Sequence, residues 1–292
     1  MRNPFISPRF HSRLCAFAVL FLSLGFPAFA AETPKEKPPV EIEASHQLEW
    51  LRDQNKYRAT TDVLIKQGST TITGDNAEAE YDAKEGPSAL TVITVTGNVV
   101  INDTGRIIHA EKAVYDTRTQ ILNLTGDTIT LDTPQMNAVA HKTMDYNAAE
   151  NKATATGNAM VKNPTQQVNG ETITAWLEKD TNRLLRAEAS GRVVITRKAP
   201  DGTADIARSG NAVYDADKNT AHLTGNVKMA RGENFMQGDD AVIDMTTGHA
   251  TLTNKTASTG AKPARVRAIF STAGNGDKPA SVTPVISASA AQ

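Results

Sequence analysis

Short segments in which apolar and polar residues alternate run through most of this chain, and they recur with a nearly constant internal spacing. In four copies an aromatic or apolar residue is followed ten positions later by threonine, and glycine or asparagine comes directly after it. The four pairs are Tyr115 and Thr125, Tyr146 and Thr156, Tyr214 and Thr224, and Ile243 and Thr253. Alternation with period two predicts strands, and a fixed loop length keeps paired strands in register. The pattern therefore predicts a series of β-hairpins.

Two further copies, Tyr81 to Thr96 and Trp176 to Ser190, carry insertions, and Trp176 stands where other copies have tyrosine. The threonine or serine anchors are 35, 29, 31, 34, 34 and 29 residues apart, at Thr61, Thr96, Thr125, Thr156, Ser190, Thr224 and Thr253. A period near thirty predicts a stack of β units, each burying its apolar face against its neighbours. The glycine that follows most anchors predicts a bend or bulge, where a Cβ would obstruct the turning strand.

Several runs are apolar at adjacent positions, including Thr91–Val95 and Val99–Ile101. A strand covered on both faces favours two sheets wrapped around an interior. The predicted fold is therefore all-β, a β-jelly-roll of stacked antiparallel strands. We expect aliphatic residues of the repeats to line its interior, with Val40 and Ile42 at its mouth: Ile72, Val92, Val99, Ile101, Leu124, Ile129, Leu131, Val213, Leu223, Val227 and Met229.

Residues 1–30 have the features of a signal peptide, with three arginines before an apolar core at Leu14–Gly25 and a small-x-small site at Ala28–Ala30. We expect cleavage after Ala30 and therefore a periplasmic protein. An uncleaved membrane anchor is the alternative. The single cysteine, Cys15, lies within this leader, so cleavage leaves no disulfide to stabilise the chain.

After a linker at residues 31–39, the β-jelly-roll domain is predicted over residues 40–253. It begins with an edge strand at Val40–Glu43, because Pro38 and Pro39 precede it. Residues 254–292 form a basic, low-complexity tail that we expect to be mostly disordered, with Val266–Phe270 as a possible last strand.

The charge distribution indicates which kinds of partner the protein can bind. Without the three leader arginines, 28 basic and 32 acidic residues remain, a net charge of −4. The tail contributes +4, which leaves −8 on the body. An acidic body argues against a nucleic acid as the main partner.

Residues typical of catalysis are present but do not converge. No nucleophile elbow, zinc-protease motif or phosphate-binding loop occurs. The carboxylate pairs Glu41/Glu43 and Asp239/Asp240 are more typical of a solvated strand or turn than of a metal or glycosidase site. The same holds for the scattered histidines at 46, 109, 141, 222 and 249. We therefore expect no enzyme activity, no catalytic residue, no metal and no cofactor.

Three segments resemble the start of the OstA family of periplasmic lipopolysaccharide-transport proteins: Pro39–Ser45, Thr61–Val63 and Lys66–Gly68. Leu223–Asn226, Leu-Thr-Gly-Asn, is similar to that family's core, and the resemblance extends over residues 40–253. LptA, LptC and the N-terminal domain of LptD share these β units. This chain differs in its insertions and in its long basic tail.

The resemblance implies a lipopolysaccharide-binding carrier, or bridge, from an inner-membrane ABC transporter complex to an outer-membrane translocon. Its implied partners are lipopolysaccharide, the inner-membrane adaptor LptC and the LptD N-terminal domain, joined by strand-edge docking, with head-to-tail self-association as a further possibility. An LptC-like anchored adaptor, a secreted β-solenoid enzyme acting on polysaccharide, and an adhesin are the alternatives.

Overall fold

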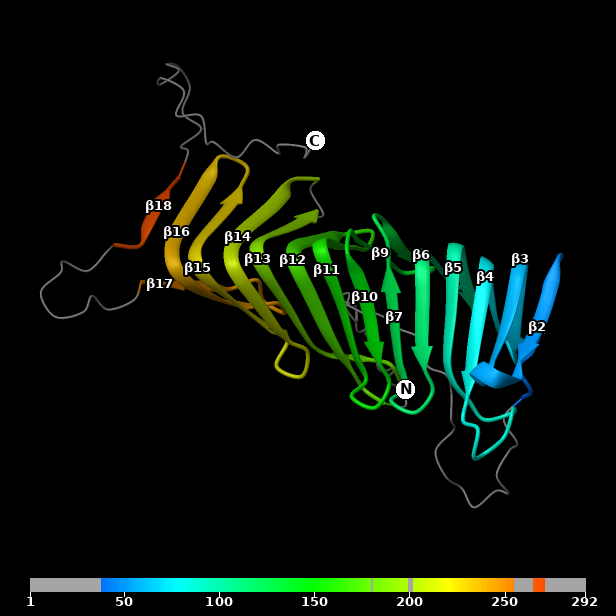
Figure 1. Ribbon diagram of the computed structural model, residues 1–292. Coiled ribbons are helices and arrows are strands. Elements are labelled where there is room, and N and C mark those ends of the chain that lie inside the picture. The colour runs from blue at the N-terminus through cyan, green and yellow to red at the C-terminus, as the bar shows by residue number, and fades with distance from the viewer. Residues whose placement is uncertain (1–37, 180, 199–201, 255–264, 271–292) are drawn as a thin grey trace, which may run out of the picture.

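Strands occupy most of the chain and join into one antiparallel sheet of 18 strands (Figure 1). The computed structural model describes residues 38–179, 181–198, 202–254 and 265–270. The predicted leader, most of the linker and most of the tail lie outside the described residues. The all-β prediction is confirmed.

The N-terminal half of the sheet contains eleven strands: β1 (Glu41–Glu43), β2 (Gln47–Leu51), β3 (Lys56–Gln67), β4 (Thr70–Tyr81), β5 (Leu90–Asp103), β6 (Arg106–Asp116), β7 (Ile121–Thr125), β8 (Ile129–Asp132), β9 (Asn137–Ala140), β10 (Thr143–Asn147) and β11 (Lys152–Lys162). A single 3-10 turn, η1 (Arg52–Gln54), joins β2 to β3. The C-terminal half contains β12 (Gln166–Leu177), β13 (Leu184–Lys198), β14 (Ala204–Asp215), β15 (Thr220–Arg231), β16 (Asn234–Asp244), β17 (Ala250–Thr253) and β18 (Arg267–Ile269).

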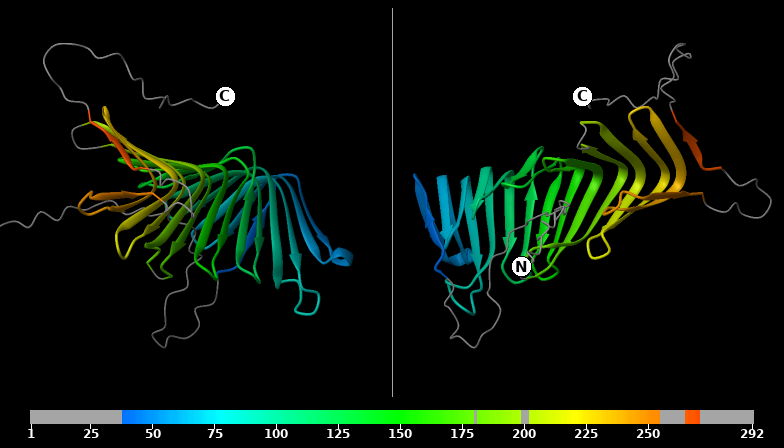
Figure 2. Two further views of the ribbon diagram at one scale, coloured as in Figure 1. Left: turned by 90° about the vertical axis from the view of Figure 1, so that its left-hand side faces the viewer. Right: turned by 180° about the vertical axis from the view of Figure 1, so that it is seen from behind.

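The sheet is folded lengthwise into two layers, because each long strand bends near its middle. Seen from the C-terminal end in Figure 2 (left), the layers diverge, with β18 in the upper layer and β17 in the lower. The upper layer also holds β1, β8 and β9, and the lower layer β2, β7 and β10. We call the line of bends the corner, and the opposite, open side of each layer its rim. This arrangement is the predicted jelly-roll, with an apolar interior between the layers.

Two consecutive residues with left-handed backbone form the corner of every second long strand. They follow or include the anchors of the sequence repeat: Thr61–Asp62, Gly97–Asn98, Gly157–Asn158, Gly191–Arg192 and Gly225–Asn226. At each of these sites the register with the neighbouring strand shifts, as in a β-bulge. A bulge bends the strand, and glycine adopts the required positive φ without strain. The predicted bend after the threonine is confirmed.

The intervening strands β4, β12, β14 and β16 carry glycine at the corner because the neighbouring strand comes too close for a side chain. A Cβ built on Gly170 lies 3.0 Å from the carbonyl oxygen of Ser190, and one on Gly74 lies 2.5 Å from Cγ1 of Val95. Repeating glycines on both kinds of strand thus let neighbouring strands turn the corner together.

In the N-terminal half, large aliphatic side chains fill the space between the layers. One row in the upper layer joins Ile65, Ile72, Ile101, Ile108 and Leu131 across β3, β4, β5, β6 and β8. Ile101, Ile108 and Leu131 in that row are at most 2% exposed. Burying one such side chain contributes about 1.5–3 kcal/mol, so this half is held together mainly by its own core.

Each end of the sheet has two short strands. At the first end β1 and β2 both pair with β3, and at the other end β17 and β18 both pair with β16. The predicted first strand is therefore an edge strand, and the possible last strand at Val266–Phe270 corresponds to β18. Among the described residues these four strands pair on one side only, which leaves backbone groups that another strand can bond.

An ion pair closes the upper rim of the N-terminal half. Arg106 donates to the carboxylate of Asp103, and both side chains are at most 7% exposed. The hydroxyls of Thr104, Thr70 and Ser69 donate to Oδ1 of Asp103 at 3.0, 3.1 and 3.2 Å. Burial acts to raise the pKa of Asp103, but the hydrogen bonds and the charge of Arg106 outweigh it, so the pKa is lowered.

We expect Gly157→Ala to destabilise the protein more than Gly105→Ala does. Both residues have positive φ, 91° and 82°, so both substitutions bear a strain of about 1–2 kcal/mol. A Cβ at Gly157 also lies 2.7 Å from Cγ and 2.9 Å from the backbone N of Lys142, whereas nothing lies within 4 Å at Gly105. Denaturant unfolding should show that Gly157→Ala lowers the free energy of unfolding by roughly 2 kcal/mol more than Gly105→Ala does. Equal losses at the two sites would show that the corner is not tightly packed.

Replacing Asp103 with asparagine should lower the free energy of unfolding by about 3–5 kcal/mol, because the Arg106 charge stays buried without its partner. The double variant Asp103→Leu/Arg106→Met should recover most of the loss. Since the pKa of Asp103 is lowered by folding, its contribution is present above its unfolded pKa of about 4 and is lost as the pH falls below it. Denaturant melts between pH 7 and pH 2 measure both effects. A single variant as stable as the double variant would contradict this role.

Candidate functional site

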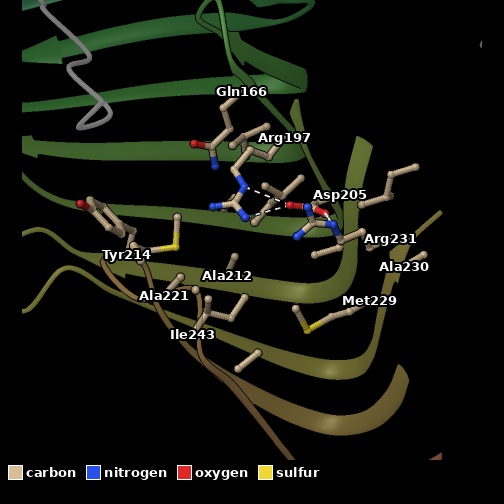
Figure 3. Close-up of a pocket in the computed structure, with 18 of the residues that line it drawn as sticks. Gln166, Arg197, Asp205, Ala212, Tyr214, Ala221, Met229, Ala230, Arg231 and Ile243 are labelled. Atoms are coloured by element: carbon tan, nitrogen blue, oxygen red, sulfur yellow. Dashed lines mark hydrogen bonds and ion pairs between the residues drawn. The ribbon is translucent and has the colours of Figure 1, made fainter. Parts of the chain in front are cut away.

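A hollow of about 290 Å³ lies between the layers in the C-terminal half of the sheet (Figure 3). Strands β11 to β17 line it, together with Phe270, and most of its lining is apolar. This volume is just below the range of about 300–1,000 Å³ that is typical of ligand pockets in proteins. The hollow is a candidate site for an apolar ligand.

Several inward positions around the hollow hold alanine. In the lower layer, Ala187, Ala212 and Ala221 occupy the rows in which the N-terminal half has larger residues such as Leu122, Leu124 and Tyr146, all of them buried. Leu122 pairs with Tyr146 across β7 and β10, whereas Tyr214 pairs with Ala187 and Ala221 across β13, β14 and β15. Fewer side-chain atoms reach the middle at these positions, and the two layers also diverge towards this end (Figure 2), so an apolar cavity lies between them.

A row of polar side chains follows the upper rim above this hollow. Arg197, Asp205 and Arg231 lie opposite one another on β13, β14 and β15. Nε and Nη2 of Arg197 lie 3.2 and 2.8 Å from Oδ2 of Asp205, and Nε of Arg231 lies 3.5 Å from Oδ1. Figure 3 shows the two guanidinium groups on either side of the carboxylate, with Gln166 beside Arg197. The site therefore combines an apolar floor with a charged edge.

At the N-terminal end of the interior, exposed apolar side chains surround the opening. Ile42 pairs with Ile65 in the upper layer. Leu48 and Trp50 lie in inward rows of the lower layer but are 56% and 44% exposed, because no strand covers β2 in the described residues. The Trp50 ring stacks on Tyr57 at 5.8 Å. The sequence analysis missed Leu48 and Trp50, although Gln47–Leu51 alternates polar and apolar residues as an edge strand does.

Most of the predicted interior residues face the space between the layers. Those that belong to the buried cluster or pack against it are Val40, Ile42, Ile72, Val99, Ile101, Leu124, Ile129, Leu131, Leu223, Val227 and Met229. Of these, Met229 lines the hollow, whereas Ile101, Leu124 and Leu131 fill the closed half. Some of the predicted interior residues therefore form the closed core, and others border the hollow.

Two predicted interior residues belong to outward rows: Val92, whose interior placement is corrected, and Val213, which still lines the hollow. Val92 pairs with Glu80 and Asp116, in the row opposite to that of Ile93. Val213 pairs with Glu188 and His222, and it borders the hollow only between the inward Ala212 and Tyr214. Adjacent apolar residues made the two faces indistinguishable in the sequence.

Trp176 also differs from its expected place. It pairs with Lys152 and Arg186, whose charged groups lie 5.8 and 5.7 Å from the centre of its ring, whereas the tyrosines of the repeat occupy inward rows. In β12 the position in the tyrosine row is Ala175. Trp176 is therefore not an equivalent of the repeat tyrosines.

The described residues contain no cluster of three or more histidine, cysteine, aspartate or glutamate side chains placed to hold a metal ion. Over the same ranges, none of the helices has the length and apolar character needed to cross a bilayer.

Comparisons with known proteins place the chain in a family. The family described as "LptA/(LptD N-terminal domain) LPS transport protein" matches residues 41–181 and 138–249, which together include most of the sheet. Among solved structures, LptH from Pseudomonas aeruginosa, described as the LptA homologous periplasmic component of the lipopolysaccharide transport device, is 18% identical. That alignment covers 47% of this chain and 95% of LptH, with a TM-score of 0.41. A search of curated proteins found no match. Because the family match extends over more than half of the sequence, the chain belongs to the LptA/LptD N-terminal domain family of lipopolysaccharide-transport proteins, and its role is in lipopolysaccharide transport.

Proposed function

We propose that this protein is an LptA-like periplasmic carrier that binds lipopolysaccharide between its two layers. It passes the lipid from the inner-membrane ABC transporter complex towards the outer-membrane translocon, and it has no enzyme activity. The observation that carries the proposal is one continuous folded sheet whose apolar interior is hollow in its C-terminal half.

The energetics of the acyl chains explain why a carrier needs such an interior. Each buried methylene contributes about 0.8 kcal/mol, so a chain of about a dozen carbons resists leaving a membrane by roughly 10 kcal/mol. An apolar hollow replaces one apolar environment with another and thereby lowers this barrier. It supplies no driving force, so a partner must provide the energy.

The interior is also long enough to connect successive binding positions. The upper layer has 14 strands, and strands in a sheet are about 4.8 Å apart, so the interior extends for about 60 Å. The hydrocarbon of a whole bilayer is about 30 Å thick, so one acyl chain is much shorter than this interior. Backbone hydrogen bonds join strands within each layer, and no strand pairing joins the two rims in the described residues. The rims can therefore separate to admit a lipid without breaking the sheet.

The two ends of the sheet supply docking edges for this route. We infer that β1 and β2 pair with a strand of the inner-membrane adaptor LptC, and that β17 and β18 face the N-terminal domain of LptD or a second copy of this chain. Edge strands can extend a sheet by strand addition, and this pairing would align the apolar interiors of neighbouring subunits. The exposed Leu48 and Trp50 at the first opening support such a contact, because exposed apolar patches mark interaction sites.

Photo-crosslinkers on β15 should capture lipopolysaccharide in a period-two pattern. We expect capture from the inward positions Ala221 and Met229, and little from the outward neighbours His222 and Lys228 on the same strand. Crosslinking in cells followed by detection of the lipid on a gel measures this. Equal capture from both sets, or from neither, would contradict lipid binding between the layers.

Replacing Ile42 with aspartate should lower both lipid capture and crosslinking to the adaptor, because a carboxylate at the opening costs several kcal/mol to bury against acyl chains. The rest of the core does not depend on this edge position, so the melting temperature should change little. Ile42→Ala is the control, since it removes packing without adding charge. Normal capture and normal adaptor crosslinking in Ile42→Asp would show that β1 is not the docking strand.

A further inference from the structure

The charged row above the hollow lies on the inward face of its strands. Along their strands, Arg197, Asp205 and Arg231 alternate with residues two positions away, Ile195, Ala207 and Met229, which line the hollow. Side chains two positions apart in a strand share a face, so these three charges face inward. Because the side chains of Arg197 and Arg231 stay partly exposed, their ion pairs with Asp205 contribute little to stability. Stability alone therefore does not account for charges here.

The same rim position in the N-terminal half has a different construction. There Asp103 and Arg106 neutralise each other, three hydroxyls donate to the carboxylate, and both side chains are nearly inaccessible. Above the hollow, the guanidinium groups of Arg197 and Arg231 both lie against the carboxylate of Asp205. The side chains of Arg197 and Arg231 are 40% and 56% exposed, which leaves them accessible from solvent and from the hollow.

We propose that Arg197 and Arg231, held apart by Asp205, bind the phosphate groups of the lipid while its acyl chains occupy the hollow. This inference rests on the proposed function and assigns the residues that recognise the head of the ligand. The lipid anchor of lipopolysaccharide carries phosphates on a sugar backbone directly above its acyl chains. An apolar floor with a cationic edge matches that order of groups.

The chemistry of arginine suits this role. A guanidinium group has five N–H donors in a fixed plane and binds phosphate in a bidentate manner. Asp205 lies on the strand between the two arginines, so its carboxylate orients both side chains and reduces their mutual repulsion. Asp205 is therefore a positioning residue, whereas the two arginines contact the phosphates.

The test compares two double variants with the same change in charge. Arg197→Gln/Arg231→Gln removes both rim cations. Arg208→Gln/Lys228→Gln removes two cations from the outward row of β14 and β15, where the two residues pair with each other. Each purified full-length protein is titrated with lipid A carrying two phosphates and with the same lipid after its phosphates are removed.

The unaltered protein and the outward control should bind the phosphorylated lipid about ten-fold more tightly than the dephosphorylated one. The rim variant should lose this preference and bind both lipids alike, with the affinity for the dephosphorylated lipid unchanged. Arg197→Lys/Arg231→Lys should retain part of the preference, since it keeps the charge without the bidentate geometry. Thermal melts check folding, and the single variant Arg231→Gln, at the more exposed residue, replaces the double variant if that one unfolds.

Three outcomes would overturn the inference. A rim variant that keeps the full preference for the phosphorylated lipid refutes the assignment while the carrier function stands. An unaltered protein that binds neither lipid refutes the carrier function itself. Inorganic phosphate that binds the unaltered protein as tightly as the phosphorylated lipid, and does so only when the rim arginines are present, would identify a site for free phosphate instead of a lipid head.

Discussion

The fold depends on one backbone constraint, which is that every long strand must turn the same corner so that both of its halves face one interior. Two consecutive left-handed residues make that turn on alternate strands, and glycine on the strands between them accepts the close approach of a neighbouring carbonyl. Because the bends lie opposite one another, the hydrogen-bonded ladder continues on both sides of the corner. Each repeat in the sequence therefore contains a corner as well as strands. Its period is the number of residues that the chain needs to cross the two layers and return.

Because both halves share this corner, the size of the inward side chains affects how completely each half fills the space between the layers. Isoleucine, leucine, methionine and tyrosine close the N-terminal half, and the buried Asp103–Arg106 pair completes its rim. In the C-terminal half the two layers diverge (Figure 2), and a hollow remains between them. The two halves thus use one strand arrangement with different packing: the first is closed by its own core, and the second is partly open.

The sequence predicted those parts of the structure that depend on a short stretch of residues. Threonine followed by glycine marked the corners, and prolines before Val40 marked an edge strand. The sequence did not show which residues face inward where both faces of a strand are apolar, as in Thr91–Val95. There, only the position relative to the corner distinguishes the outward Val92 from the inward Ile93. The Thr61–Asp62 corner lacks glycine, so its left-handed backbone could not be read from residue type. The hollow could not be predicted from any single residue, because its lining comes from several strands that meet only in the folded sheet.

The family match adds a constraint on how the stack grew. Its two matching segments, residues 41–181 and 138–249, overlap, yet the structure shows no break between them, and β11 pairs with β12 across the overlap as any two neighbours do. In a stack where each unit contacts only its neighbours, units can be added without disturbing those already present. At the ends, β1, β2, β17 and β18 each pair on one side only within the described residues. For the carrier that we propose, a longer sheet would reach further with the same two edges, so each subunit would cover more distance for every contact with a partner.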